Sequence, residues 1–183
     1  MKVLDDLVFS SRKEMKPFPH NIGFLFPNSS IVPKEKENLL VFLREPDSKE
    51  IQNCLSKRIP IVFETNSLKE SFSALKWHAV KVLYVNPIKK QPLVDVAWMN
   101  VARQTGKSVV FSWIDFKKMV SHKNVKALER MRFFSRLLEK YKVPAGIASF
   151  SFSEKEEKGS TEELDSLAGY LGIKKLEIVV SEW

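Results

Sequence analysis

The stretch at residues 59–86 constrains the fold most, because it reads as a strand, a helix and a second strand in quick succession. Ile59–Phe63 and Val80–Val85 are apolar runs, and amphipathic helical spacing follows turn residues at Thr65–Ser67. Neither run alternates polar with apolar residues, which is the pattern of strands buried on both faces. Parallel neighbours need a crossover between them, usually a helix. The stretch therefore predicts one parallel βαβ unit.

The same alternation of strands and helices continues along the chain from Leu39. Three expected helix starts have Asp or Ser followed three residues later by Glu, the spacing of a capping box: Asp47 with Glu50, Ser67 with Glu70, and Ser160 with Glu163. Further helices are expected near Leu93–Gln104 and Asn124–Lys142. The expected strands are Val3–Phe9, Ile22–Phe26, Leu39–Leu43, Ile59–Glu64, Val80–Val85, Ser108–Trp113, Ala145–Phe150 and Lys175–Val180.

This order of elements predicts an α/β fold with a mainly parallel sheet. Eight strands favour a small TIM-like barrel with helices outside and an irregular first third; an open doubly wound sheet is the alternative. The 183 residues contain no linker rich in Gly or Ser, so we expect a single domain over residues 1–183.

Several classes of protein are disfavoured by composition. No apolar run approaches the roughly 20 residues that span a bilayer, and the N-terminus does not resemble a secretory signal. The single cysteine, Cys54, excludes an internal disulfide and a Cys-based zinc site. These features favour a cytoplasmic protein without a membrane partner.

Positive charge gives the first indication of a partner. The net charge is +8 and the isoelectric point is near 9.5, which indicates either a polyanionic partner such as nucleic acid or a merely solvated basic surface, so the positions of the basic residues must decide. Basic residues concentrate between Lys107 and Lys142, and those on the expected long helix are spaced four apart. The candidate RNA-binding residues are Lys89, Lys90, Lys117, Lys118, Lys123, Lys126, Arg130, Arg132, Arg136 and Lys140. Phosphate contacts by such residues give affinity without base specificity.

Aromatic residues could add base stacking to these contacts. Trp77 and Phe133 fall off the apolar stripes of their expected helices, and Trp113 ends an expected strand. A place in the core or in a protein interface is the competing interpretation for each of the three.

A search for catalytic chemistry at the carboxyl ends of the strands finds little. His20, His78 and His122 are not spaced as ligands, and the chain lacks glycine-rich phosphate loops. Glu64 with Asp115 could act as acid and base, although two ordinary loop carboxylates are the simpler interpretation. We therefore predict no catalytic residue, no metal site and no cofactor.

Several segments, taken in order, resemble one known family. They are IVFETNSLKESFSAL, VVFSW, RFFSRLLEKYKVP, IASFSFS and STEELDSLAGYLGI, within Leu39–Trp183. Together they resemble the archaeal and eukaryotic ribonuclease P protein component 3 family. The resemblance implies a TIM-like barrel related to the metal-dependent PHP phosphoesterases but without their metal site. LDDLVFSS resembles the first strand, which in those enzymes carries a His-x-His pair that is missing here.

The resemblance also implies a function and partners. It implies a non-catalytic, RNA-binding subunit that supports a catalytic RNA in removing 5′ leaders from precursor tRNA, together with another small protein subunit. One departure concerns the strand end, where Trp113, Ile114 and Asp115 replace the family's Leu-Arg-Pro. Lys117 or Lys118 replaces that arginine only partly, because lysine lacks the bidentate fork. A metal-dependent PHP-like or amidohydrolase-like hydrolase and a protein-interaction scaffold remain the alternatives.

Overall fold

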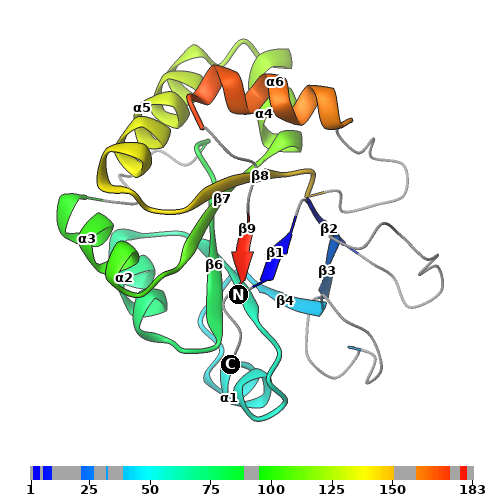
Figure 1. Ribbon diagram of the computed structural model, residues 1–183, viewed down its shortest axis with the longest axis vertical. Coiled ribbons are helices and arrows are strands. Elements are labelled where there is room, and N and C mark those ends of the chain that lie inside the picture. Colours follow the sequence, from blue (N-terminus) through cyan, green and yellow to red (C-terminus); the bar gives the residue numbers. More distant parts are fainter. Residues whose placement is uncertain are drawn as a thin grey trace.

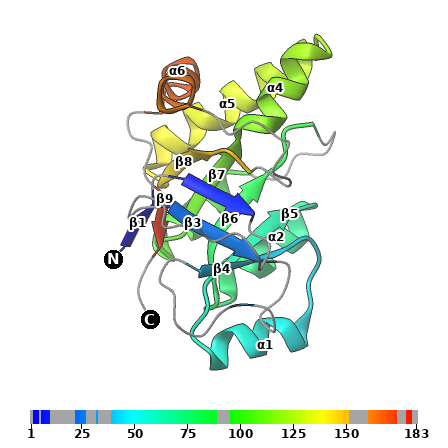
Figure 2. The same ribbon diagram turned by 90° about the vertical axis from the view of Figure 1, so that its right-hand side faces the viewer.

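The computed structural model describes residues 2–4, 6–9, 22–26, 32, 39–88, 95–150, 160–173 and 178–180. Its main sheet has seven parallel strands in chain order: β2 (Asp6–Phe9), β3 (Ile22–Phe26), β4 (Leu39–Leu43), β5 (Ile61–Thr65), β6 (Val80–Val85), β7 (Ser108–Ser112) and β8 (Ala145–Ala148). The sheet curls so that β8 comes close to β2, and within the described residues these two strands are not paired (Figures 1 and 2).

Six helices of the described chain lie outside this curve (Figure 1). They are α1 (Ser48–Ser56), α2 (Leu68–Lys76), α3 (Val96–Gln104), α4 (Trp113–Ser121), α5 (Val125–Tyr141) and α6 (Thr161–Leu171). The fold is therefore an α/β TIM-like half-barrel, and the predicted fold class is confirmed.

A separate two-stranded ribbon lies within the curve of the sheet. β1 (Lys2–Leu4) pairs antiparallel with β9 (Ile178–Val180), and β9 lies beside β6 and β7 (Figure 1). The single strand expected at Val3–Phe9 is thus two strands in two sheets. The strand expected at Lys175–Val180 is described only from Ile178 onward, and it does not join the parallel sheet.

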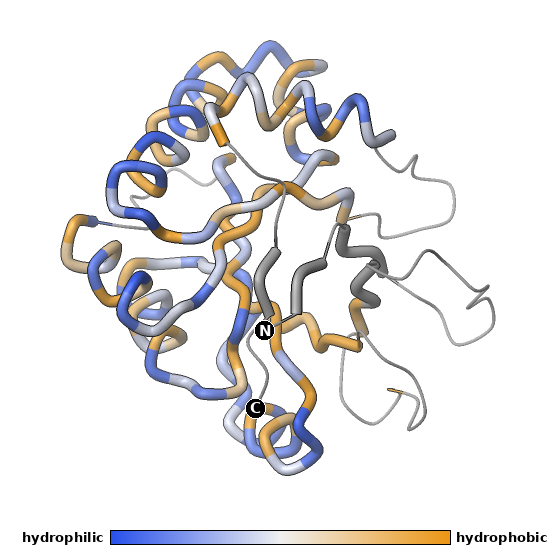
Figure 3. Tube along the Cα trace, viewed as in Figure 1, coloured by the Kyte–Doolittle hydropathy of each residue, from blue (hydrophilic) through white to orange (hydrophobic). Residues whose placement is uncertain are grey.

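The strands of the main sheet bury both faces, as the unbroken apolar runs predicted. On β5, Ile61 and Phe63 pack toward the helices, whereas Val62 belongs to a second cluster without helix residues, on the concave face. Phe42, Tyr84 and Phe150 enlarge that inner cluster, and the ring centroids of Tyr84 and Phe150 are 4.7 Å apart. Figure 3 shows the apolar strands surrounded by helices whose outer turns are hydrophilic. Alternate side chains of one strand therefore serve different cores.

The three predicted helix starts are each capped, but a reciprocal capping box is described at one of the three. The Asp47 side chain accepts from the Lys49 and Glu50 amides, and the Ser67 hydroxyl accepts from the Glu70 amide. Ser160 and Glu163 form the full reciprocal capping box. Each cap satisfies amide groups that the first turn of a helix leaves without carbonyl partners.

Helix α4 follows β7 directly, in a segment for which the sequence predicted no helix. The strand ends at Ser112 rather than Trp113, and the Ser112 hydroxyl accepts from the Asp115 amide at 3.1 Å. Trp113, Ile114 and Met119 bury one side of the new helix. The Ser-x-x-Asp spacing is itself a capping signal, so the sequence contained the information for this helix start.

Lys107 lies inside the protein rather than on its basic surface. Only 5% of its surface is exposed, and its ammonium donates to the carbonyl oxygens of Trp77, at 2.8 Å, and of Val80. Burial, with a smaller contribution from Lys81, lowers the pKa of Lys107 from 10.5 to about 8. This lysine joins the start of β7 to the end of α2 and is not available to a polyanion.

Lys107→Met should remove a pH dependence from the free energy of unfolding. Between the folded pKa near 8 and the unfolded value of 10.5, the unfolded chain binds more protons, so Lys107 makes stability rise with pH. We expect the stability of the wild type relative to K107M to rise by about 2 kcal/mol from roughly pH 7.5 to 9.5. Urea unfolding at each pH measures it, with exposed Lys49→Met as control. Equal pH profiles for wild type and K107M would contradict the assignment.

Candidate functional site

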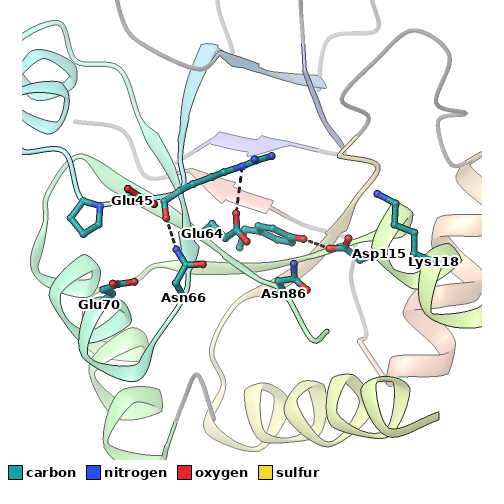
Figure 4. Close-up of a pocket in the computed structure, with 10 residues that line it drawn as sticks. Glu45, Glu64, Asn66, Glu70, Asn86, Asp115 and Lys118 are labelled. Carbon is teal, nitrogen blue, oxygen red and sulfur yellow. Dashed lines mark hydrogen bonds and ion pairs between the residues drawn. The ribbon is translucent and has the colours of Figure 1, made fainter. Parts of the chain in front are cut away.

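A polar pocket of about 680 Å³ lies at the carboxyl ends of β4, β5 and β6, where active sites of TIM-like barrels occur (Figure 4). Charged and amide side chains from the segments after these strands surround it, together with two residues of α4. The residues that line it are Arg44, Glu45, Pro46, Glu64, Asn66, Glu70, Tyr84, Asn86, Asp115 and Lys118.

The floor of the pocket is built from Glu64, Tyr84 and Asp115. Glu64 and Tyr84 are paired in the register of β5 and β6, and Asp115 lies in the first turn of α4. All three are at least nine-tenths buried, and the Tyr84 hydroxyl donates to Asp115 Oδ2. Burial, followed by the adjoining Asp115 and Glu64 carboxyl groups, raises the pKa of Tyr84 well above 10, whereas Arg44 opposes this shift. Tyr84 is therefore a neutral hydrogen-bond donor at neutral pH.

Arg44 forms the wall above Glu64. Its Nε lies 3.7 Å from Glu64 Oε2, and its guanidinium lies 5.9 Å from the centre of the Phe42 ring. The Asn66 amide donates to the carbonyl oxygen of Arg44 (Figure 4), which ties the segment after β4 to the end of β5. The pocket carries both signs of charge, because the carboxyl groups of Glu64 and Asp115 form its floor and the cations of Arg44 and Lys118 also line it.

The structure thus brings Glu64 and Asp115, the pair singled out as a possible acid and base, into one pocket. Sequence reasoning missed Tyr84, because that residue is part of an apolar strand. Arg44, Asn66 and Asn86 carried a usable signal, since Arg44 and Asn86 directly follow predicted strands and Asn66 lies two residues beyond another. Among the described residues, no three or more His, Cys, Asp and Glu side chains are grouped in a way that could hold a metal ion.

A second hollow, of about 690 Å³, lies along the basic helix α5. Lys126, Glu129, Arg130 and Phe133 line it from the helix, Asn124 lies at the helix start, and Ile88 lines it from the segment after β6. We call this hollow the α5 groove. It brings together two of the predicted RNA-binding residues, Lys126 and Arg130.

The other predicted RNA-binding residues are distributed around α4 and α5. Lys117 and Lys118 are exposed on α4, and Lys118 lines the strand-end pocket; Lys123 is exposed in the turn between the helices. Arg132, Arg136 and Lys140 are all exposed on α5, and the Arg132 guanidinium also lies 5.5 Å from the centre of the Tyr170 ring on α6. Lys89 and Lys90 lie outside the described residues. One of the described members of the predicted set therefore lines the pocket and two line the α5 groove, while the others lie on the exposed surfaces of α4, α5 and the turn between them.

The three aromatic residues considered for base stacking differ in their burial. The half-buried Trp77 packs against Phe63 of the core, with ring centroids 5.4 Å apart, and the buried Trp113 stacks on Phe116 at 5.6 Å, so both rings are used in internal packing. Phe133 has 65% of its surface exposed and lines the α5 groove.

The fold and the pocket define an α/β protein of the TIM-like barrel class with a polar strand-end site. The chain is similar, at 18% identity and a TM-score of 0.64, to a chain in a cryo-EM structure of archaeal ribonuclease P with mature tRNA, with 91% of this chain and 81% of that one covered. It is also similar to an uncharacterized protein solved by crystallography, at 13% identity and a TM-score of 0.51. There the match covers 74% of this chain and only 40% of the other protein's length.

These likenesses show a shared fold. No family model matches the sequence, and no curated protein matches it. The helices of the described chain include none with the length and apolar character required to cross a membrane.

Tyr84→Phe should destabilise the protein by about 2 kcal/mol, because the buried Asp115 carboxyl group loses a hydrogen-bond donor. Urea unfolding measures the change. Tyr170→Phe, at a position 41% exposed, is the matched control and should change stability by less than about 0.5 kcal/mol. Equal effects of the two substitutions would show that the Tyr84–Asp115 bond does not support the pocket floor.

Proposed function

We propose that this chain is a non-catalytic, RNA-binding protein subunit of a ribonuclease P. The observation that carries the proposal is the shared fold, over 91% of the chain, with a protein chain found in an archaeal ribonuclease P structure that contains mature tRNA. The ordered segments that resemble the ribonuclease P protein component 3 family support the same assignment independently of the fold.

The basic surface supplies the physical means of binding. Lys126, Arg136 and Lys140 are exposed on α5, and Arg130 lies beside Lys126 in the α5 groove. Such side chains neutralise phosphates and release counterions, which favours binding to a folded RNA of any sequence. In this proposal the catalytic RNA cleaves the precursor tRNA, and the protein, as one domain in the cytoplasm, stabilises that RNA together with another small protein subunit.

Lys126→Glu should weaken binding to a structured RNA and lower its salt dependence. For the wild type we expect a log–log slope of several units, and K126E should reduce its magnitude by about one or two. Lys49→Glu is a matched control, because Lys49 and Lys126 are both exposed second residues of their helices. Filter binding across a salt series measures both slopes. Equal losses in K126E and K49E would mean that net charge, and not α5, governs binding.

Co-purification tests the assembly itself. The tagged full chain, recovered from its own cells at low salt, should bring down a long structured RNA and a second small protein. Recovery of neither component would overturn the proposed function.

The strand-end pocket favours a second candidate function, a hydrolase. Its buried Glu64, Tyr84 and Asp115 converge on a cavity large enough for a small substrate (Figure 4). If this alternative holds, the protein should retain or require a divalent ion. It should also catalyse hydrolysis without RNA, and both Glu64→Gln and Asp115→Asn should abolish that activity. A subunit that acts only with its RNA shows none of these properties.

A further inference from the structure

Phe133 is an exposed aromatic residue on α5, and along the described length of this helix the only other exposed large apolar side chain is Val125, at its first position. Ala127, Met131, Phe134 and Leu138 face the core, yet 65% of the Phe133 surface remains in contact with solvent. Hydration of a large ring is unfavourable, and Phe133 is not needed to complete this core. A surface ring of this kind is available for a ligand.

Cations flank this ring on both sides along α5. Arg130 and Arg136 are three residues away in either direction, so each is a neighbour of Phe133 on the helix surface. Lys126 and Lys140 lie seven residues away, about two turns or roughly 10.5 Å along the axis. The ring therefore stands within a row of positive side chains.

The α5 groove gives the ring a defined setting. Ile88 lies across the groove from the helix residues, and two cations against one carboxylate, Glu129, leave the lining with a net positive charge. A flat apolar face between phosphate-binding cations is the arrangement by which proteins hold single-stranded nucleic acid. An acidic protein segment would gain less from an isolated flat ring than an unpaired base does.

We propose that the α5 groove binds single-stranded RNA, with one unpaired base stacked on Phe133 and the adjoining phosphates on Lys126 and Arg130. This inference rests on the proposed function, because it assigns a base-contacting residue to the RNA-binding surface. Stacking on an aromatic face accepts any base, so the groove recognises an unpaired nucleotide rather than a sequence.

The test uses single-stranded oligoadenylate that carries a fluorescent adenine analogue, with a duplex of equal length for comparison. Phe133→Leu keeps an apolar side chain at an exposed helical position but removes the aromatic face. We expect F133L to weaken single-strand binding about tenfold and to abolish the fluorescence change that stacking produces. Phe133→Trp should retain both, and duplex binding should stay the same in all three proteins.

Salt dependence separates this inference from the proposed function. F133L should keep the wild-type salt slope, because stacking releases no counterions, whereas K126E should lower it. Wild-type binding and fluorescence in F133L, with a steep salt slope, would overturn stacking and leave the RNA-binding function standing. A wild-type protein that binds no RNA would overturn both. Loss of a co-purifying protein in F133L, with RNA binding unchanged, would make the groove a protein-docking site and overturn the stacking.

Discussion

Burial of parallel strands on both faces is the constraint on which the other features depend. Val62 joins the inner cluster while its neighbours Ile61 and Phe63 pack toward the helices, so each strand supports two cores at once. Because side chains alternate, the position two residues beyond Val62 points to the inner side, and that position is Glu64. Tyr84 lies beside it in register on β6. The polar pocket is thus a continuation of the inner core, formed where the strands end and apolar residues give way to polar ones.

The same tertiary structure assigns different tasks to side chains that look alike in the sequence. Lys107 is buried and donates to two backbone carbonyl groups, Arg132 lies over Tyr170 between two helices, and Lys126 lines an open groove. The first arrangement keeps a cation away from an RNA phosphate, whereas Arg132 and Lys126 are both exposed and remain within its reach. Net charge therefore overstates the charge available for binding, and the burial of each basic group decides its contribution.

Much of the fold was predictable because it follows from local patterns. The unbroken apolar runs indicated parallel strands, and the residues at Asp47, Ser67 and Ser160 marked helix starts that the structure confirms. Helix α4 was missed although Ser112 and Asp115 carry the same spacing, because Trp113 read as the end of a strand. The split of Val3–Phe9 between two sheets had no local signal, since the pairing of β1 with β9 joins the two ends of the chain.

The sequence alone determined the class of fold and the candidate cations and carboxylates, because periodicity and charge are properties of neighbouring residues. It placed Glu64 and Asp115 on separate segments, and it offered Trp77 and Phe133 as stacking candidates while leaving Trp113 undecided. Only the tertiary structure brought Tyr84 between the two carboxyl groups, packed both tryptophans against core aromatic rings and left Phe133 exposed beside Lys126 and Arg130. The physical reason is that burial and electrostatic contact depend on distance in space, which the curl of the sheet and the packing of the helices decide.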